Sequence, residues 1–126
     1  MDLAKLLSLL QGAQEGSEYL DYAIQRVLFR MTKPVPLYSR SLDGAMLLVP
    51  EGWTLHRLGE LSNCRGGTGG WVADIYRPQD AFIAFPSEGT AATAALALCT
   101  AAVRTRLGLA QQAEEPQQAQ QRSAAT

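Results

Sequence analysis

The side chains most able to do chemistry in this chain are few and far apart in sequence. His56 is the only histidine, and Cys64 and Cys99 are the only cysteines. Nucleophilic catalysis or zinc binding needs such groups in pairs or clusters, and no Cys-x-x-Cys, His-x-x-x-His or His-Glu-x-x-His spacing is present. We therefore predict no catalytic residue, no metal and no cofactor, and we interpret His56 as a partly exposed strand residue.

A glycine-rich run at residues 65–70 could suggest a phosphate-binding loop. Such loops follow a strand, lead into a helix and often carry Lys-Ser or Lys-Thr. This run joins two predicted strands and has no lysine, so we interpret it as a hairpin loop.

The carboxylates are scattered, and acid–base catalysis by a pair of them needs a defined separation. Asp74 is the exception that we single out, because it lies in the middle of an apolar strand. Burial of Asp74, or an arginine beside it, would make the position interesting. An enzyme that uses Asp74 or His56 in a cleft is one alternative hypothesis, and it predicts a pocket beside one of them.

Composition limits the class of protein. The chain has 126 residues, 47% of them hydrophobic, and a formal net charge of −1. This length suits one domain with one core, and the near balance of charge gives no overall attraction to nucleic acid or to an anionic membrane. The leucine-rich N-terminus is too short and wrongly flanked for a signal peptide, and no apolar run reaches the length of a membrane span. We predict a cytoplasmic protein that does not bind membranes.

Hydrophobic periodicity predicts four helices and three strands. The helices are expected at residues 2–14, 18–31, 42–49 and 90–107, with Ser17 and Ser41 or Ser39 as caps, and the strands at 53–58, 71–76 and 81–85. Short connections between the strands imply an antiparallel meander.

The predicted fold class is α+β: a three-stranded antiparallel meander between helices, in α/β/α layers, with the order α-α-α-β-β-β-α. Both faces of each strand carry apolar side chains, so we expect helices on both faces of the sheet. The long and short helices would cover one face, and the two N-terminal helices or a second subunit the other. We expect one domain at residues 1–109, with N-terminal helices at 2–31 and the sandwich core at 36–107. Residues 110–126 form a Gln/Ala-rich tail that we predict to be disordered.

Two blocks of sequence carry a resemblance to a known family. Residues 38–53 read YSRSLDGAMLLVPEGW, and residues 90–102 read TAATAALALCTAA. Together they resemble the phage ABA-sandwich domain family, and the resemblance covers residues 36–107. It implies a layered domain encoded by phages, prophages or related elements, and so a protein of the bacterial host cytoplasm, with virion association left open. It brings no activity and no functional residues with it.

We predict that this is a phage- or prophage-related accessory protein that acts by binding a protein partner or a second copy of itself, not by catalysis. No small-molecule substrate is indicated. An alternative is a nucleic-acid-binding module, since one helix, three strands and a helix also follow the order of double-stranded-RNA-binding domains. The candidate binding residues are Arg57, Arg65, Trp71 and Arg77.

Overall fold

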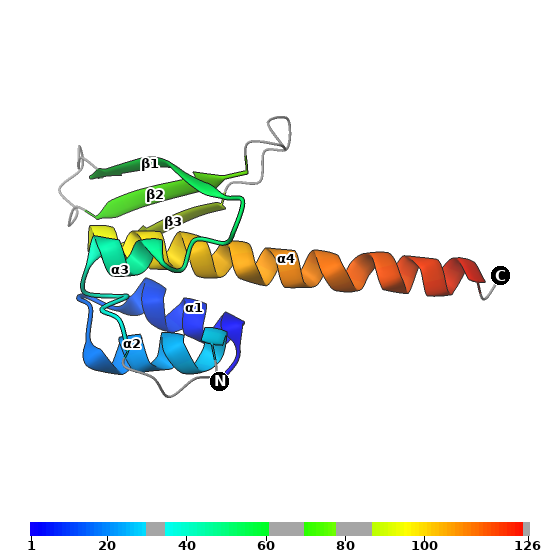
Figure 1. The fold of residues 1–126 in the computed structure, drawn as a ribbon, viewed down its shortest axis with the longest axis horizontal. Coiled ribbons are helices and arrows are strands. Elements are labelled where there is room, and N and C mark those ends of the chain that lie inside the picture. The colour runs from blue at the N-terminus through cyan, green and yellow to red at the C-terminus, as the bar shows by residue number, and fades with distance from the viewer. Residues whose placement is uncertain (30–34, 61–69, 78–86, 125–126) are drawn as a thin grey trace.

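The computed structural model describes residues 1–29, 35–60, 70–77 and 87–124. The elements, in chain order, are α1 (Leu3–Gly12), α2 (Glu18–Ile24), the π-helix η1 (Gln25–Phe29), α3 (Leu42–Met46), β1 (Thr54–Glu60), β2 (Trp71–Tyr76), β3 (Ser87–Ala91) and α4 (Ala94–Ala124). Figure 1 shows the sheet on one side of α4 and the N-terminal helices on the other.

The predicted N-terminal helices are confirmed, and polar side chains define where they begin. The Asp2 carboxylate accepts a hydrogen bond from the Lys5 amide at 2.9 Å, and the Ser17 hydroxyl accepts one from the Leu20 amide at 3.1 Å. Such caps satisfy amides that have no partner within the first turn of a helix. Ser41 caps α3 in the same way.

The helix predicted at residues 18–31 changes its winding after Ile24. The five residues of η1 form π-helical turns. Two contacts with Tyr38 fix this segment: the tyrosine hydroxyl donates to Gln25 Oε1 at 2.5 Å, and its ring stacks on Phe29 with the centroids 6.0 Å apart. Gln25 is buried, so the π-helical winding brings a polar side chain to a partner inside the core.

The sheet is antiparallel in the order β1-β2-β3. β2 has the predicted bounds, and β1 begins and ends slightly later than predicted. A bulge at His56 places two residues of β1 opposite Asp74. The strand predicted at 81–85 lies outside the described residues.

The observed third strand lies in the predicted turn before the last helix and overlaps the first two residues of the helix predicted at 90–107. Gly89 explains the difference, because a Cβ atom at this position would collide with the backbone of Ala101 and Ala97 in α4. The glycine therefore lets β3 run directly against α4. The helix begins only at Ala94, after Thr93, whose hydroxyl accepts a hydrogen bond from the Leu96 amide at 3.2 Å.

The last helix is also longer than predicted. It continues to Ala124, through the segment that we expected to be disordered. Alanine, glutamine and glutamate are strong helix formers, and extending an existing helix needs no new nucleus. None of the helices in the described ranges is long and apolar enough to cross a membrane.

The predicted α+β fold class, with a three-stranded antiparallel sheet packed against helices, is confirmed. The position of the N-terminal helices differs from our expectation, because α1 and α2 lie on the side of α4 that faces away from the sheet (Figure 1). Residues 95–103 of α4 are buried between the two groups, which explains why this part of the helix is apolar all round. Ala73 and Ile75 point from β2 into this core. Within the described residues, the opposite face of the sheet has no helix over it.

Candidate functional site

The three candidate binding residues that the structure describes do not form one cationic surface. Arg57 lies on β1 and is engaged by carboxylates, and Arg77 lies with its guanidinium 5.5 Å from the centre of the Trp53 ring. Trp71 is half-buried at the start of β2 and packs against the core. Arg65 lies outside the described residues. The three candidates that the structure places therefore have partners within the chain.

An arginine lies beside Asp74, which is one of the arrangements that, from the sequence alone, would make this position interesting. Arg57 Nη2 lies 2.8 Å from Asp74 Oδ2 and 3.6 Å from a carboxylate oxygen of Glu88. The three side chains come from three neighbouring strands, because Arg57 and Glu88 both pair in register with Asp74. The Asp74 side chain is only 20% exposed, and its Oδ1 atom is buried without a hydrogen-bond partner. This row of charges lies on the sheet face opposite α4.

His56 is exposed in the bulge of β1. Its ring packs edge-on against Tyr76 with the centroids 5.1 Å apart. The residue thus lies close in sequence to the Arg57–Asp74 pair but interacts with an aromatic ring. No group of three or more His, Cys, Asp or Glu side chains in the described ranges is placed to hold a metal ion.

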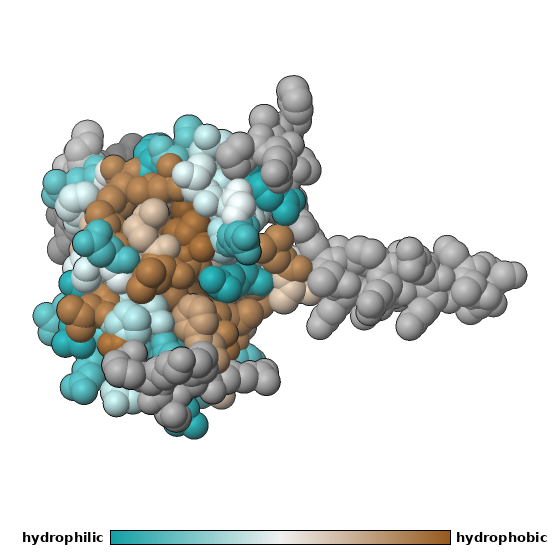
Figure 2. All heavy atoms as spheres, viewed as in Figure 1, coloured by the Kyte–Doolittle hydropathy of each residue, from teal (hydrophilic) through white to brown (hydrophobic). Residues whose placement is uncertain are grey.

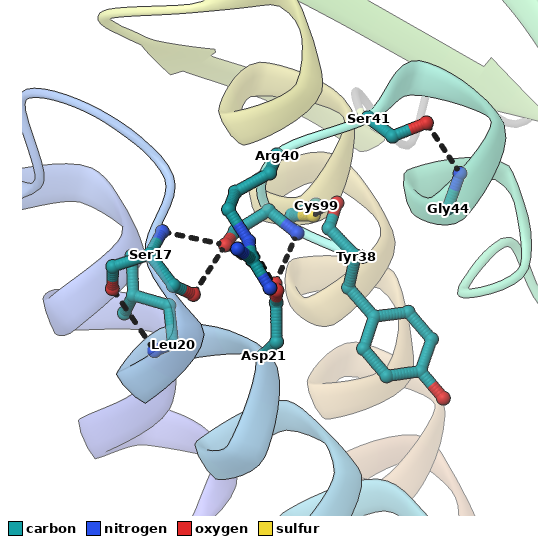
Figure 3. A network of polar contacts seen from close by, with 9 residues as sticks. Ser17, Leu20, Asp21, Tyr38, Arg40, Ser41, Gly44 and Cys99 are labelled. Atoms are coloured by element: carbon teal, nitrogen blue, oxygen red, sulfur yellow. Dashed lines mark hydrogen bonds and ion pairs between the residues drawn. The ribbon is translucent and has the colours of Figure 1, made fainter. Parts of the chain in front are cut away.

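A buried polar network joins α2 to the segment before α3 (Figure 3). Asp21 is 1% exposed and accepts hydrogen bonds from Ser39 and from Arg40 Nε, the latter at 2.8 Å. Ser39 Oγ in turn accepts a hydrogen bond from the Ser17 amide at 3.0 Å. Both Asp21 carboxylate oxygens and the Ser39 hydroxyl are paired inside the protein, so the network fixes the segment before α3 and offers no free group for catalysis.

Tyr38 and Cys99 extend the same region into the core. The Cys99 thiol donates to the Tyr38 carbonyl oxygen at 3.1 Å. Burial raises the pKa of the Cys99 thiol, and the nearby Asp21 charge adds to the effect. Burial, with a contribution from Asp21, also raises the pKa of the Tyr38 hydroxyl. A thiol held in its neutral form is a poor nucleophile, so Cys99 acts as a core residue.

Large apolar side chains gather on the surface of α3 and the neighbouring strands (Figure 2). Leu42, Met46 and Leu47 are 39%, 40% and 59% exposed. Val49, Leu55 and Leu58, which are partly buried, lie at the edge of the core beside them. We refer to these six residues as the α3–β1 surface.

The α3–β1 surface is open because α4 covers only part of the sheet. α4 packs mainly against β3 and β2, and β1 lies at the far side of the sheet (Figure 1). Leu55 and Leu58 pair in register with Ile75 and Ala73, so they face the side of the sheet that carries the core. The single short turn of α3 leaves them partly exposed. The result is an apolar face bordered by an edge strand and a short helix.

A second exposed apolar area lies on α2. Tyr19 and Tyr22 are exposed and line a hollow of about 490 Å³ together with Met1, Ala23, Arg26 and Val27. Two tyrosines and an arginine give this hollow a mixed polar and apolar lining, in contrast to the aliphatic α3–β1 surface.

Comparison of the chain with models of protein families, with curated proteins and with solved structures finds no match. The resemblance to phage ABA-sandwich proteins therefore stays a prediction. The function has to be argued from the surfaces described above.

Sequence reasoning missed two features of the site. Two features of the sequence could have predicted that Asp21 is buried. Asp21 lies next to the apolar stripe of its helix, and residues 38–41, which follow, are rich in hydroxyl groups that could bind a carboxylate. The α3–β1 surface could have been predicted less clearly. Met46, Leu47 and Leu48 are consecutive, so a single helical turn cannot bury all three side chains. In the structure Leu48 is fully buried, whereas Met46 and Leu47 are exposed.

Proposed function

We propose that this protein acts by binding another protein through the α3–β1 surface. We further propose that it is a phage-related accessory protein, as its resemblance implies. The observation that carries the binding proposal is the group of exposed large side chains on α3, Leu42, Met46 and Leu47, next to a partly covered strand. Single exposed leucines are ordinary, but contiguous apolar patches on folded domains usually mark interaction sites.

Burial of the three exposed side chains on α3 would contribute favourable free energy to binding. Full burial of one large aliphatic side chain contributes about 1.5–3 kcal/mol, so completing the burial of three half-exposed ones contributes about 3 kcal/mol. The partly buried leucines of β1 add to this without any rearrangement of the fold. Side chains that lose all contact with water near the centre of an interface contribute most of its binding energy.

The rigidity of the surface supports the same proposal. The Asp21 network fixes Ser39, two residues before Ser41, and Gly44 lies so close to the Leu37 carbonyl that a Cβ atom would not fit. Arg106 Nε donates to the Leu48 carbonyl oxygen at 2.9 Å, which attaches the end of α3 to α4. A surface held in place before binding loses little conformational entropy when a partner arrives.

Site-specific photo-crosslinking in the cells that naturally express the protein tests this proposal. A photoreactive phenylalanine analogue replaces Leu47 in one variant and Tyr22, in the α2 hollow, in a control of similar exposure. We expect a discrete adduct from position 47 that disappears when Leu42→Ser and Met46→Ser are added, and none from position 22. An adduct from position 22 alone, or one at position 47 that the serine substitutions leave unchanged, would refute the proposal.

A further inference from the structure

We propose that the partner element on the α3–β1 surface is an amphipathic helix of another protein whose apolar stripe is flanked by lysine or arginine. This inference rests on the proposed function and specifies the chemistry of the partner. It follows from the width of the uncovered sheet and from the charges around it.

The part of the sheet that α4 leaves uncovered has the width of one helix. Neighbouring strands lie about 4.8 Å apart, and a helix with its side chains is about 10 Å wide, so one helix covers about two strands. α4 lies against β3 and β2, and α3 packs on α4, so the inner side of β1 that short α3 leaves uncovered is where a second helix can lie (Figure 1). Helix-in-groove binding uses this arrangement, with apolar anchors at positions i, i+3, i+4 and i+7. Leu42 and Met46 are themselves four residues apart, so they form one row on α3.

Exposed carboxylates border the α3–β1 surface. Each element that borders the surface carries an exposed carboxylate: Asp43 in the first turn of α3, Glu51 in the turn after it, and Glu60 at the end of β1. In the part of the chain that the structure describes, these three carboxylates form no ion pair. Figure 2 shows hydrophilic residues around the apolar patch. The border is therefore acidic.

Among the described residues, four arginines lie near this surface, and each is held by contacts within the chain: Arg106 is half-buried and donates a hydrogen bond to the Leu48 carbonyl oxygen. Arg40 is paired with Asp21, and Arg57 is paired with Asp74 on the other face of the sheet. The side chain of Arg77 lies over the Trp53 ring. Charge complementarity across an interface favours the partner of opposite sign and disfavours one of like sign, so a basic flank fits and an acidic flank does not.

A second copy of this chain fits less well. A symmetric dimer through the same surface would bring Asp43, Glu51 and Glu60 of one copy toward the same carboxylates of the other. The exposed apolar face of α2 carries Glu18 as well as Arg26, so it lacks a basic flank. Self-association is therefore an outcome of the test that would count against the proposal.

The test compares three fluorescent 18-residue peptides with the full chain by fluorescence anisotropy. One has a leucine stripe at helical spacing with lysine and arginine on both flanks, the second has the same stripe with glutamate flanks, and the third has the basic composition with the leucines scrambled. We expect the first peptide to bind at least about tenfold more tightly than either of the others, since three ion pairs of modest strength together give about this factor. The preference should shrink at 0.5 M salt because salt screens exposed charges.

Matched variants identify the carboxylates. Glu51→Gln with Glu60→Gln removes two charges from the border. Glu15→Gln with Glu18→Gln removes two exposed charges from the start of α2 and the connection before it. We expect the first pair to weaken binding of the basic peptide about fivefold and the second pair to leave it unchanged. Equal effects of the two pairs would overturn the assignment of the border.

The two proposals fail in different ways. Equal binding of the basic and acidic peptides, or a dimer in sedimentation equilibrium that either peptide dissociates, would overturn the basic-helix inference while crosslinking at position 47 still supports a binding surface. Loss of the position-47 crosslink as well would overturn the proposed function itself. Tight binding of the scrambled peptide would overturn the inference, because it would show attraction by charge alone.

Discussion

Asp21 Oδ1 accepts two hydrogen bonds from Ser39, one from the backbone amide at 2.7 Å and one from the hydroxyl at 2.6 Å. The residues are 18 positions apart in sequence, so these bonds hold α2 against the segment that leads into α3. A carboxylate that is almost fully buried needs such partners, because removal from water is costly for a charged group. The position of the α3–β1 surface thus depends on the contact between Asp21 and Ser39, which holds the segment that leads into α3.

Asp21→Ala should therefore destabilise the fold strongly. It leaves the Ser39 amide without its acceptor and Arg40 without its partner, and we expect a loss of about 3 kcal/mol in the free energy of unfolding. Arg40→Ala should cost about 1 kcal/mol, because this side chain is half-exposed and Asp21 keeps both bonds from Ser39. Urea denaturation measures both, and equal losses for the two variants would contradict this ranking.

Gly89→Ala tests the close approach of β3 to α4. The added methyl group would collide with the backbone of Ala97 and Ala101, which cannot move without separating the sheet from the helix. We expect a loss of about 2 kcal/mol or more in unfolding free energy. Gly59→Ala is the matched control on β1, where a Cβ atom meets nothing within 4 Å, and its melting temperature should stay close to that of the wild type. A similar loss in both variants would show that strand propensity, and not packing, sets the effect.

The buried Cys99 thiol predicts a loss of stability in alkali. Its pKa is raised above the usual 9.0 in the folded protein, so at higher pH the thiol ionises in the unfolded chain first. The unfolded chain then binds fewer protons, and the contribution of Cys99 to stability, intact below pH 9.0, falls by about 1.4 kcal/mol at pH 10. The raised pKa of Tyr38 acts in the same direction above its usual 10.0.

Urea denaturation at pH 8 and pH 10 isolates this effect when Cys64→Ser is the background. Adding Cys99→Ala should make the loss between the two pH values smaller by about 1.4 kcal/mol, whatever its effect on the stability at pH 8. The same loss with and without Cys99 would show that the thiol does not contribute.

The Arg57–Asp74 pair should contribute modestly. The Arg57 side chain is more than half exposed, and an ion pair at such a position is worth about 0.5–1 kcal/mol. A double-mutant cycle with Arg57→Ala and Asp74→Ala measures this coupling directly. Arg57→Ala alone should be the more harmful substitution at low salt, because it leaves Asp74 beside Glu88 without a cation. A coupling energy near zero would mean that the pair only marks the register of the strands.

The sequence was a good guide where one pattern dominated. The leucine stripe of α1, the Ser17 cap of α2 and the alternation in β2 all predicted the observed elements. It was a poor guide to β3, since Ser87–Ala91 has no apolar alternation, and only contact with α4 explains why Gly89 lies in a strand.

The candidate site was harder to predict, because each of its parts depends on contacts between distant segments. Arg57 and Asp74 were both singled out, but their pairing depends on the strand register and on the bulge at His56. The burial of Asp21 depends on where the chain returns at Ser39. The open side of the sheet depends on α1 and α2 packing behind α4, which no local pattern in the sequence specifies.

The most direct test of the central claim is the dissociation constant of the complex with the partner that crosslinking identifies. It should be measured for the wild type, Leu47→Asp and Tyr22→Asp, each checked for an unchanged melting temperature. Leu47→Asp should weaken binding at least about 30-fold, because it loses about 1 kcal/mol of apolar burial and buries an unpaired charge that costs at least about as much. Tyr22→Asp should change the constant less than about twofold. An unchanged constant for Leu47→Asp, or a larger effect from Tyr22→Asp, would show that the protein does not bind through α3 and β1.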